Sequence, residues 1–215
     1  KIEGIIPVML TPFNKDNTVD YDGLRKLTEW YINNGATTLF ATCQSSEILF
    51  LSLEEKINIT KTVIEQTKGR IPVVTSGHTG NTLAEQIEEL KAMYDTGADA
   101  VILITNRLDP NNEGTEVLKR NFEALTKALP QDIKLGLYEC PVPYRRLLTD
   151  EEISYFAEFE NMLVLKDVSC DLETVKRRIK LTEKSNLKIV NANAAIAFEA
   201  MKAGSAGFSG VFNNI

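Results

Sequence analysis

The chain has 215 residues, of which 43% are hydrophobic and 25% are charged, as in an ordinary globular protein, and no apolar run is long enough to span a membrane. Its net charge of −6 argues against nucleic acid or an anionic membrane surface as the main partner. Because it has three cysteines without a C-x-x-C pair and only one histidine, we expect a reduced, cytoplasmic protein without a metal site built from His and Cys.

Short apolar runs alternate with amphipathic segments through the first half of the chain. Asp20 is placed as an N-cap, and Ser52 and Thr82 each begin a capping box, so these three residues predict the starts of helices. The expected strands are 4–10, 37–42, 71–77 and 100–105, and the expected helices are 20–34, 52–68 and one that begins at 82.

The second half of the chain repeats this alternation. The expected strands are 134–138, 162–166, 187–193 and 207–211. Four helices are expected: one that ends near 129, one that begins at 149, one that covers 171–183 and one that ends near 203. Gly35, Gly97 and Gly204 each end a helix shortly before a strand, which indicates repeated αβ turns.

Eight strands that alternate with seven helices predict an α/β protein made of parallel βα units. We expect a (β/α)8 TIM barrel and not an open doubly wound sheet, because no G-x-G-x-x-G turn follows the first strand. Residues 1–215 then form one barrel that is incomplete at its C-terminal end, since no helix follows the eighth strand. Such a chain is either a shortened version or a natural remnant, with the outer faces of strands one and eight exposed.

The carboxyl ends of the strands locate the chemistry, because barrels of this kind build their active sites there. Tyr138 and Lys166 end the fifth and sixth strands, which lie about 4.8 Å apart in a sheet. A buried, neutral lysine beside a phenol favours Schiff-base chemistry, in which the amine attacks a ketone and the tyrosine moves protons. Other candidates at these strand ends are Thr11, Ser45, Ser46, Glu47, His78, Asn106–Asp109, Asn193, Ser209 and Gly210.

Ordinary structural roles are open for the same residues. Lys166 could end its strand in solvent, and Tyr138 could be a common strand aromatic. His78 lies in a Gly-rich turn that lacks the lysine and hydroxyl of a phosphate-binding loop, so we expect it to be structural or exposed.

Several motifs are similar to those of the pyruvate-dependent class I aldolases and synthases, the family of dihydrodipicolinate synthase and N-acetylneuraminate lyase. Tyr138–Pro141, which reads Tyr-Glu-Cys-Pro, resembles the family's Tyr-Asn-x-Pro motif. Leu165–Asp171 resembles its Schiff-base motif, Gly-x-Lys-Asp-x-Ser-x-Asp. Thr11–Phe13, Leu51–Lys56 and Gly97–Ala100 match further family segments in the same order, so that the likeness covers all 215 residues.

The resemblance implies that Lys166 forms an imine with pyruvate or a related 2-keto acid, and that Tyr138 is the general acid and base. The implied reaction is aldol condensation or cleavage with an aldehyde partner, by a carbon–carbon or carbon–oxygen lyase. It needs no metal and no organic cofactor, because the imine on Lys166 is itself the electron sink. Family members are commonly tetramers, so we expect a homo-oligomer, either a tetramer or a dimer.

The loop after the second strand departs from the family pattern. The family has Gly-Thr-Thr-Gly-Glu, whose hydroxyl pair holds the keto-acid carboxylate, whereas Cys43–Glu47 reads Cys-Gln-Ser-Ser-Glu. Ser45 keeps a hydroxyl in register and Ser46 substitutes for the lost one, so we expect both to bind substrate, unless the segment is a plain polar loop. Thr11 and Ser209, from the first and eighth strands, are further substrate-binding candidates.

The loops after the fourth and fifth strands also differ. In the synthases a tyrosine from a neighbouring subunit completes a proton relay, and Leu108 cannot do so. Pro143 stands where the synthases have a substrate-binding arginine; Arg145 or Arg146 could bind a carboxylate instead, or the two could be solvated loop charges. Glu139 stands where asparagine is usual. These departures weaken an assignment to dihydrodipicolinate synthase itself and leave open a catalytically weak relative that binds a keto acid or has a regulatory role.

Overall fold

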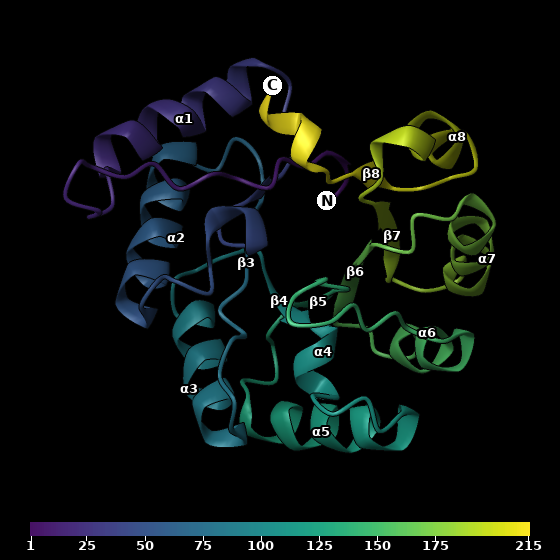
Figure 1. The fold of residues 1–215 in the computed structure, drawn as a ribbon. Coiled ribbons are helices and arrows are strands. Elements are labelled where there is room, and N and C mark those ends of the chain that lie inside the picture. Colours follow the sequence, from purple (N-terminus) through teal and green to yellow (C-terminus); the bar gives the residue numbers. More distant parts are fainter.

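In a computed structural model that describes residues 1–215, eight parallel strands curl around a common interior and the helices lie outside them (Figure 1). The strands are β1 (Gly4–Ile5), β2 (Leu39–Phe40), β3 (Val73–Thr75), β4 (Ala100–Ile104), β5 (Leu135–Tyr138), β6 (Met162–Asp167), β7 (Lys188–Asn191) and β8 (Gly207–Phe208). Their order is β1-β8-β7-β6-β5-β4-β3-β2, and a parallel bridge from Val8 to Phe40 closes the ring. The predicted (β/α)8 TIM barrel is confirmed.

The helices begin where the capping residues predict. Asp20 accepts a hydrogen bond from Gly23 N at 2.9 Å, and the capping boxes at Ser52 and Thr82 are both formed. A single helical turn, α4, follows β4 directly and was not predicted, because it has no capping side chain and only four residues. The helices are α1 (Tyr21–Asn33), α2 (Leu53–Thr67), α3 (Leu83–Tyr94), α4 (Thr105–Leu108), α5 (Thr115–Ala128), α6 (Asp150–Ala157), α7 (Leu172–Thr182) and α8 (Ala197–Lys202).

Several strands are shorter than expected. The run 4–10 forms a ladder only at Gly4–Ile5, because Pro7 has no N–H to donate. The chain nevertheless continues alongside β2, where Phe40 N donates to Pro7 O at 3.1 Å and Met9 N donates to Phe40 O at 3.1 Å. The barrel wall is therefore continuous past the ends of the assigned strands.

Alternate residues of each strand fill the barrel interior. On β4, Ile102 and Ile104 face this interior, whereas Val101 and Leu103 join the outer layer between sheet and helices. The position of Gly136 on β5 has no room for a side chain, because a Cβ there would lie 2.6 Å from atoms of both Ile102 and Val164. The interior is thus packed, apart from a cavity of about 20 Å³ among its side chains. Its buried hydrophobic members are Ile6, Val8, Phe40, Cys43, Val74, Ala100, Ile102, Ile104, Tyr138, Cys140, Val164 and Val190.

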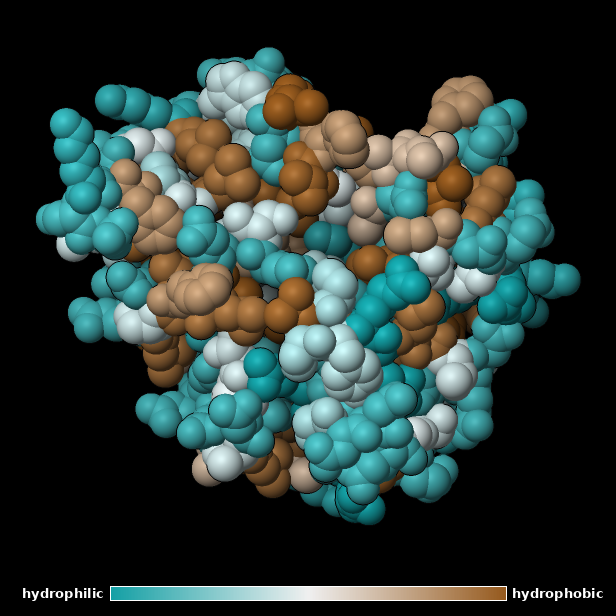
Figure 2. Space-filling view, viewed as in Figure 1, coloured by the Kyte–Doolittle hydropathy of each residue, from teal (hydrophilic) through white to brown (hydrophobic).

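The outer side of β1 lacks a covering helix, as the sequence predicts, whereas β8 contacts α8 and neither of its residues is exposed. Ile5 on β1 is 43% exposed, and the chain after β8 forms only the short 3-10 turn η3 (Val211–Asn214). Hydrophobic colour gathers on the upper edge of Figure 2, over α8 and this last turn, where Phe198 and Phe212 are largely exposed. No helix in the structure combines the length and the hydropathy that a membrane span requires.

The substitution Gly136→Ala tests the packing of the interior. The added methyl group has to displace Ile102 and Val164, so we expect a loss of about 1–3 kcal/mol in the free energy of unfolding. Urea denaturation of the two proteins measures this difference. An unchanged midpoint and slope would show that the interior has spare volume beside β5.

Candidate active site

The register of β5 and β6 brings the two main candidates together. Tyr138 pairs with Lys166 across the strands, and both side chains point into the barrel near the carboxyl ends of the strands. The Lys166 Nζ lies 4.4 Å from the centre of the Tyr138 ring and 5.6 Å from the centre of the Phe40 ring. Lys166 is only 8% exposed, so the reading in which it ends its strand in solvent is wrong.

The amine of Lys166 is buried without a carboxylate to pair with. Burial lowers its pKa from the ordinary value, and the nearby thiols of Cys43 and Cys140 oppose this shift only in part. Burial also raises the pKa of Tyr138, which keeps the phenol protonated. The strand ends therefore place a proton-donating phenol beside an amine whose neutral form is favoured.

Gln44, in the 3-10 turn η1 (Gln44–Ser46), is a site residue that sequence reasoning did not select. The Tyr138 hydroxyl donates to Gln44 Oε1 at 3.3 Å, and the Cys140 thiol lies 3.7 Å from the same oxygen. An amide oxygen accepts a hydrogen bond but does not pass a proton on as a hydroxyl does. Gln44 could have been selected from the sequence, because it lies directly after β2 in the segment that departs from the family pattern.

The two serine hydroxyls of the η1 turn differ in burial and in hydrogen bonding. Ser46 Oγ is fully buried and donates to the carbonyls of Met9 and Ala41, while its own carbonyl accepts a hydrogen bond from Thr11 Oγ1 at 2.8 Å. Ser46 and Thr11 thus hold the loop against the segment that follows β1. Ser45 is half-buried, and its hydroxyl makes no hydrogen bond within the protein.

Ser209 shares a small internal cavity with Lys166. The cavity has a volume of about 20 Å³, enough for one water molecule, and its remaining lining is hydrophobic. Ser209 is buried, and its hydroxyl oxygen has no hydrogen-bond partner. The structure therefore places Ser209 and Lys166 beside the same small space.

The two neighbouring arginines separate into an exposed one and a buried one. Arg145 is exposed and reaches Val168 O, in the loop after β6, at 3.4 Å. Arg146 is buried, with its Nε 2.9 Å from Asp109 Oδ2 and its Nη2 2.6 Å from Glu152 Oε1. Arg146 is consequently committed to two carboxylates of the protein, and Arg145 is the one free to meet a substrate anion.

His78 and Leu108 are both structural. His78 is fully buried; its Nδ1 accepts from Ile104 N at 2.9 Å, and its Nε2 lies 2.9 Å from Gln86 Oε1. Since Nδ1 accepts, Nε2 carries the proton and donates to the amide. Burial lowers the pKa of His78 to about 4. Leu108 is fully buried in the outer hydrophobic layer.

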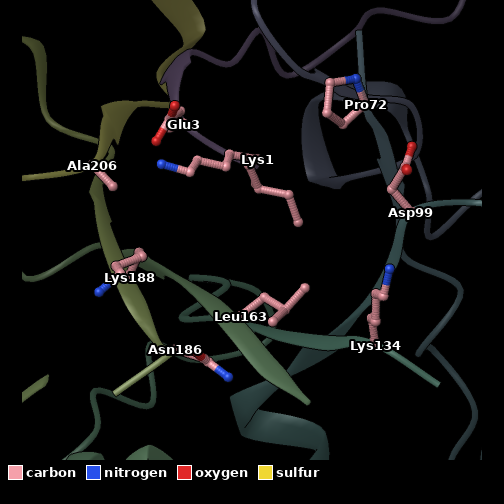
Figure 3. Close-up of a pocket in the computed structure, with 10 residues that line it drawn as sticks. Lys1, Glu3, Pro72, Asp99, Lys134, Leu163, Asn186, Lys188 and Ala206 are labelled. Atoms are coloured by element: carbon pink, nitrogen blue, oxygen red, sulfur yellow. The ribbon is translucent and has the colours of Figure 1, made fainter. Parts of the chain in front are cut away.

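A larger hollow lies at the opposite end of the barrel, where the strands begin. It has a volume of about 350 Å³, and Figure 3 shows the side chains around it, among them Asp99, Lys134 and Lys188. Both lysines are exposed to water, unlike Lys166. No group of three or more His, Cys, Asp or Glu side chains is arranged to hold a metal ion anywhere in the structure. The pairing of a buried amine with a phenol is therefore the stronger candidate site.

Fold and site together define a (β/α)8-barrel protein with a buried lysine and a tyrosine at the carboxyl ends of neighbouring strands. The model of the dihydrodipicolinate synthetase family matches residues 1–215, the whole chain. The chain belongs to this family.

Individual relatives agree with this assignment. The 4-hydroxy-tetrahydrodipicolinate synthase of Cellvibrio japonicus is 30% identical over 215 residues, which cover 100% of this chain and 72% of that protein. The same enzyme of Methanococcus maripaludis is 29% identical and is covered to 71%. The fold is also similar to the crystal structure of a chloride-inhibited dihydrodipicolinate synthase from Acinetobacter baumannii complexed with pyruvate, with a TM-score of 0.89 and 31% sequence identity. The match covers 100% of this chain and 72% of that chain.

The buried histidine makes the stability depend on pH. The unfolded chain takes up a proton at His78 as the pH falls through 6.5, whereas the folded chain does not until about pH 4, so stability is lost within that interval. The loss attributable to His78 reaches about 3 kcal/mol. We expect His78→Asn, which does not titrate, to lose less free energy of unfolding than the parent between about pH 7 and pH 4.5. Urea denaturation over this range measures it, and equal losses in the two proteins would contradict the assignment.

Proposed function

We propose that this protein is a Schiff-base-forming class I aldolase or lyase that acts on pyruvate or a related 2-keto acid. The observation that carries the proposal is the buried amine of Lys166, which lacks a carboxylate partner and lies 4.4 Å from the centre of the Tyr138 ring. Membership of the dihydrodipicolinate synthetase family supports it, as does the pyruvate in the crystal structure of the relative from Acinetobacter baumannii.

The first chemical step needs a neutral amine. The Lys166 nitrogen attacks the C2 carbonyl carbon of the keto acid, and the resulting carbinolamine loses water to give a protonated imine. The desolvated position of Lys166 favours the neutral nucleophile, since an ammonium ion has no lone pair with which to attack. Loss of a proton from C3 then yields an enamine, whose carbon attacks the aldehyde in the condensation direction.

The proton transfers are assigned to Tyr138. Its hydroxyl donates to the oxygen that leaves C2 as water, and the phenolate accepts the proton from C3. The raised pKa of Tyr138 keeps the hydroxyl protonated in the resting state, and a cationic imine beside the ring stabilises the phenolate when it forms. Because Gln44 accepts the hydroxyl hydrogen bond, Tyr138 exchanges protons with the substrate and not through a chain of hydroxyls.

The substrate carboxylate is assigned to the mouth of the barrel. Ser45 supplies an unpaired hydroxyl, the loop that Ser46 and Thr11 brace supplies backbone N–H groups, and Ser209 supplies a second free hydroxyl. Arg145 lies beside the loop after β6, in reach of a charged aldehyde partner. The imine replaces any metal or organic cofactor as electron sink, and the expected homo-oligomer stays a prediction.

Reduction of the imine with borohydride tests the proposal. We expect incubation with pyruvate and borohydride to leave one reduced adduct per chain on Lys166, seen by peptide mass spectrometry, and Lys166→Arg to abolish it. Lys56→Arg is the matched control, because Lys56 is also buried but pairs with Glu89 at 3.4 Å and hydrogen-bonds Thr79 at 2.6 Å. A folded parent protein that gives no adduct would refute the proposal and favour a relative that only binds a keto acid.

The variant Tyr138→Phe tests the acid–base assignment. It removes only the hydroxyl, so we expect the rate of proton exchange at C3 of pyruvate to fall by about 10²- to 10⁴-fold. Proton NMR in heavy water follows the exchange. Tyr94→Phe is the control, because the Tyr94 hydroxyl bonds Asp132 on the outside of the barrel. Equal exchange by the parent and Tyr138→Phe would assign the base elsewhere.

A further inference from the structure

A buried cluster of charges lies directly behind the candidate site. Glu139 and Asp167 each follow an active-site residue, Tyr138 and Lys166, and point to the opposite side of the sheet. Both carboxylates converge on Arg178 of α7, the helix that follows β6 and packs against β7 on the outside of the barrel (Figure 1). Arg178 Nη2 lies 2.7 Å from Glu139 Oε1 and its Nη1 lies 2.9 Å from Glu139 Oε2, while Nη1 also donates to Asp167 Oδ2. One guanidinium group therefore links the ends of both catalytic strands.

The same cluster also holds the two loops that leave these strands. Glu139 Oε1 accepts from Leu148 N at 2.7 Å, and Glu139 Oε2 accepts from Val168 N at 2.9 Å. Arg178 Nη2 donates to Leu148 O at 2.8 Å. The end of the loop after β5, the start of the loop after β6 and helix α7 are thus fastened to a single point.

Stability alone does not account for such a cluster. All three side chains are at most 1% exposed, and burying three charges costs free energy that ion pairing repays only when the geometry is very good. One cation faces two carboxylates, and burial raises the pKa of Glu139 even though Arg178 acts against that shift. Hydrophobic residues of similar volume would fill the space at no greater cost. The charged groups add a fixed orientation that hydrophobic residues would not supply, because the planar guanidinium group fixes the plane of the carboxylate it binds.

Strand geometry connects the fixed orientation of Glu139 and Asp167 to the positions of the catalytic side chains. Successive side chains of a strand point to opposite faces, so the backbone orientation that Glu139 and Asp167 fix from outside also sets where Tyr138 and Lys166 point inside. A displacement of about 1 Å between reacting groups costs about 10²-fold in rate. We propose that Arg178 is a positioning residue, which holds the phenol of Tyr138 and the amine of Lys166 at their working separation through Glu139 and Asp167.

This inference rests on the proposed function, because it concerns the approach of Lys166 and Tyr138 to a keto acid. Arg178→Lys keeps the positive charge and loses the fork. We expect the adduct formed with pyruvate and borohydride to reach one per chain on Lys166 as before. The rates of its formation and of C3 proton exchange should fall by about 10- to 100-fold, with the same pH dependence as the parent.

A matched control separates positioning from loss of stability. Arg146 is another buried arginine with a fork to a carboxylate and a second carboxylate partner, and its side chain pairs with Glu152 and Asp109 and with neither Glu139 nor Asp167. We expect Arg146→Lys to lower the melting temperature by a similar amount and to change both rates by less than about threefold. Equal rates for Arg178→Lys and the parent, or an equal loss in both arginine variants, would overturn the inference.

A second variant covers the case in which Arg178→Lys does not fold. Glu139→Gln keeps the shape and removes one carboxylate from the cluster, and the same slow but complete adduct formation is expected. Parent-like rates for that variant would also overturn the inference. Failure of the proposed function is distinct from both results, because the parent protein itself would then form no adduct.

Discussion

The burial of one uncompensated amine is the constraint on which the rest of the site depends. An ammonium ion in a dry interior needs a partner, and in its absence the neutral form is favoured. The protein contains both situations: Lys56 is buried against Glu89, whereas Lys166 faces two aromatic rings and no carboxylate. Burial lowers the pKa of both amines, but the Glu89 carboxylate opposes the shift at Lys56, whereas no carboxylate opposes it at Lys166.

The two faces of β5 and β6 carry different groups with different roles. Toward the interior they present the phenol and the amine, and toward the helices they present Glu139 and Asp167, which Arg178 joins. A side-chain period of two makes this division unavoidable, because orienting one face of a strand orients the other. Glu139, which departs from the family pattern, is therefore paired with a cation, the Arg178 guanidinium of α7.

Much of the fold follows from local signals in the sequence. Capping residues such as Asp20, Ser52 and Thr82 mark helix starts within a few positions, and the repeated alternation indicates parallel βα units. The meeting of Tyr138 and Lys166 was predictable as well, since consecutive strands of a barrel are neighbours. Strand lengths were overestimated, because a ladder depends on donors in the adjacent strand and not only on an apolar run.

The parts of the site that were not predicted depend on contacts distant in sequence. Glu139 lies 39 positions from Arg178, and Gln44 lies 94 positions from Tyr138, so no spacing rule connects them. Arg146 and its neighbour Arg145 are equivalent in sequence, and only the carboxylates around Arg146 distinguish them.

The pKa of Lys166 in the free protein tests the central claim most directly. NMR of protein with ¹³C at the lysine Cε carbons, with Lys166 assigned by comparison with Lys166→Arg, follows each amine as the pH rises. The account predicts that the Lys166 signal titrates clearly below the ordinary value of 10.5. Titration of Lys166 together with the exposed lysines would contradict it, because the amine would then be charged at neutral pH and unable to attack a ketone.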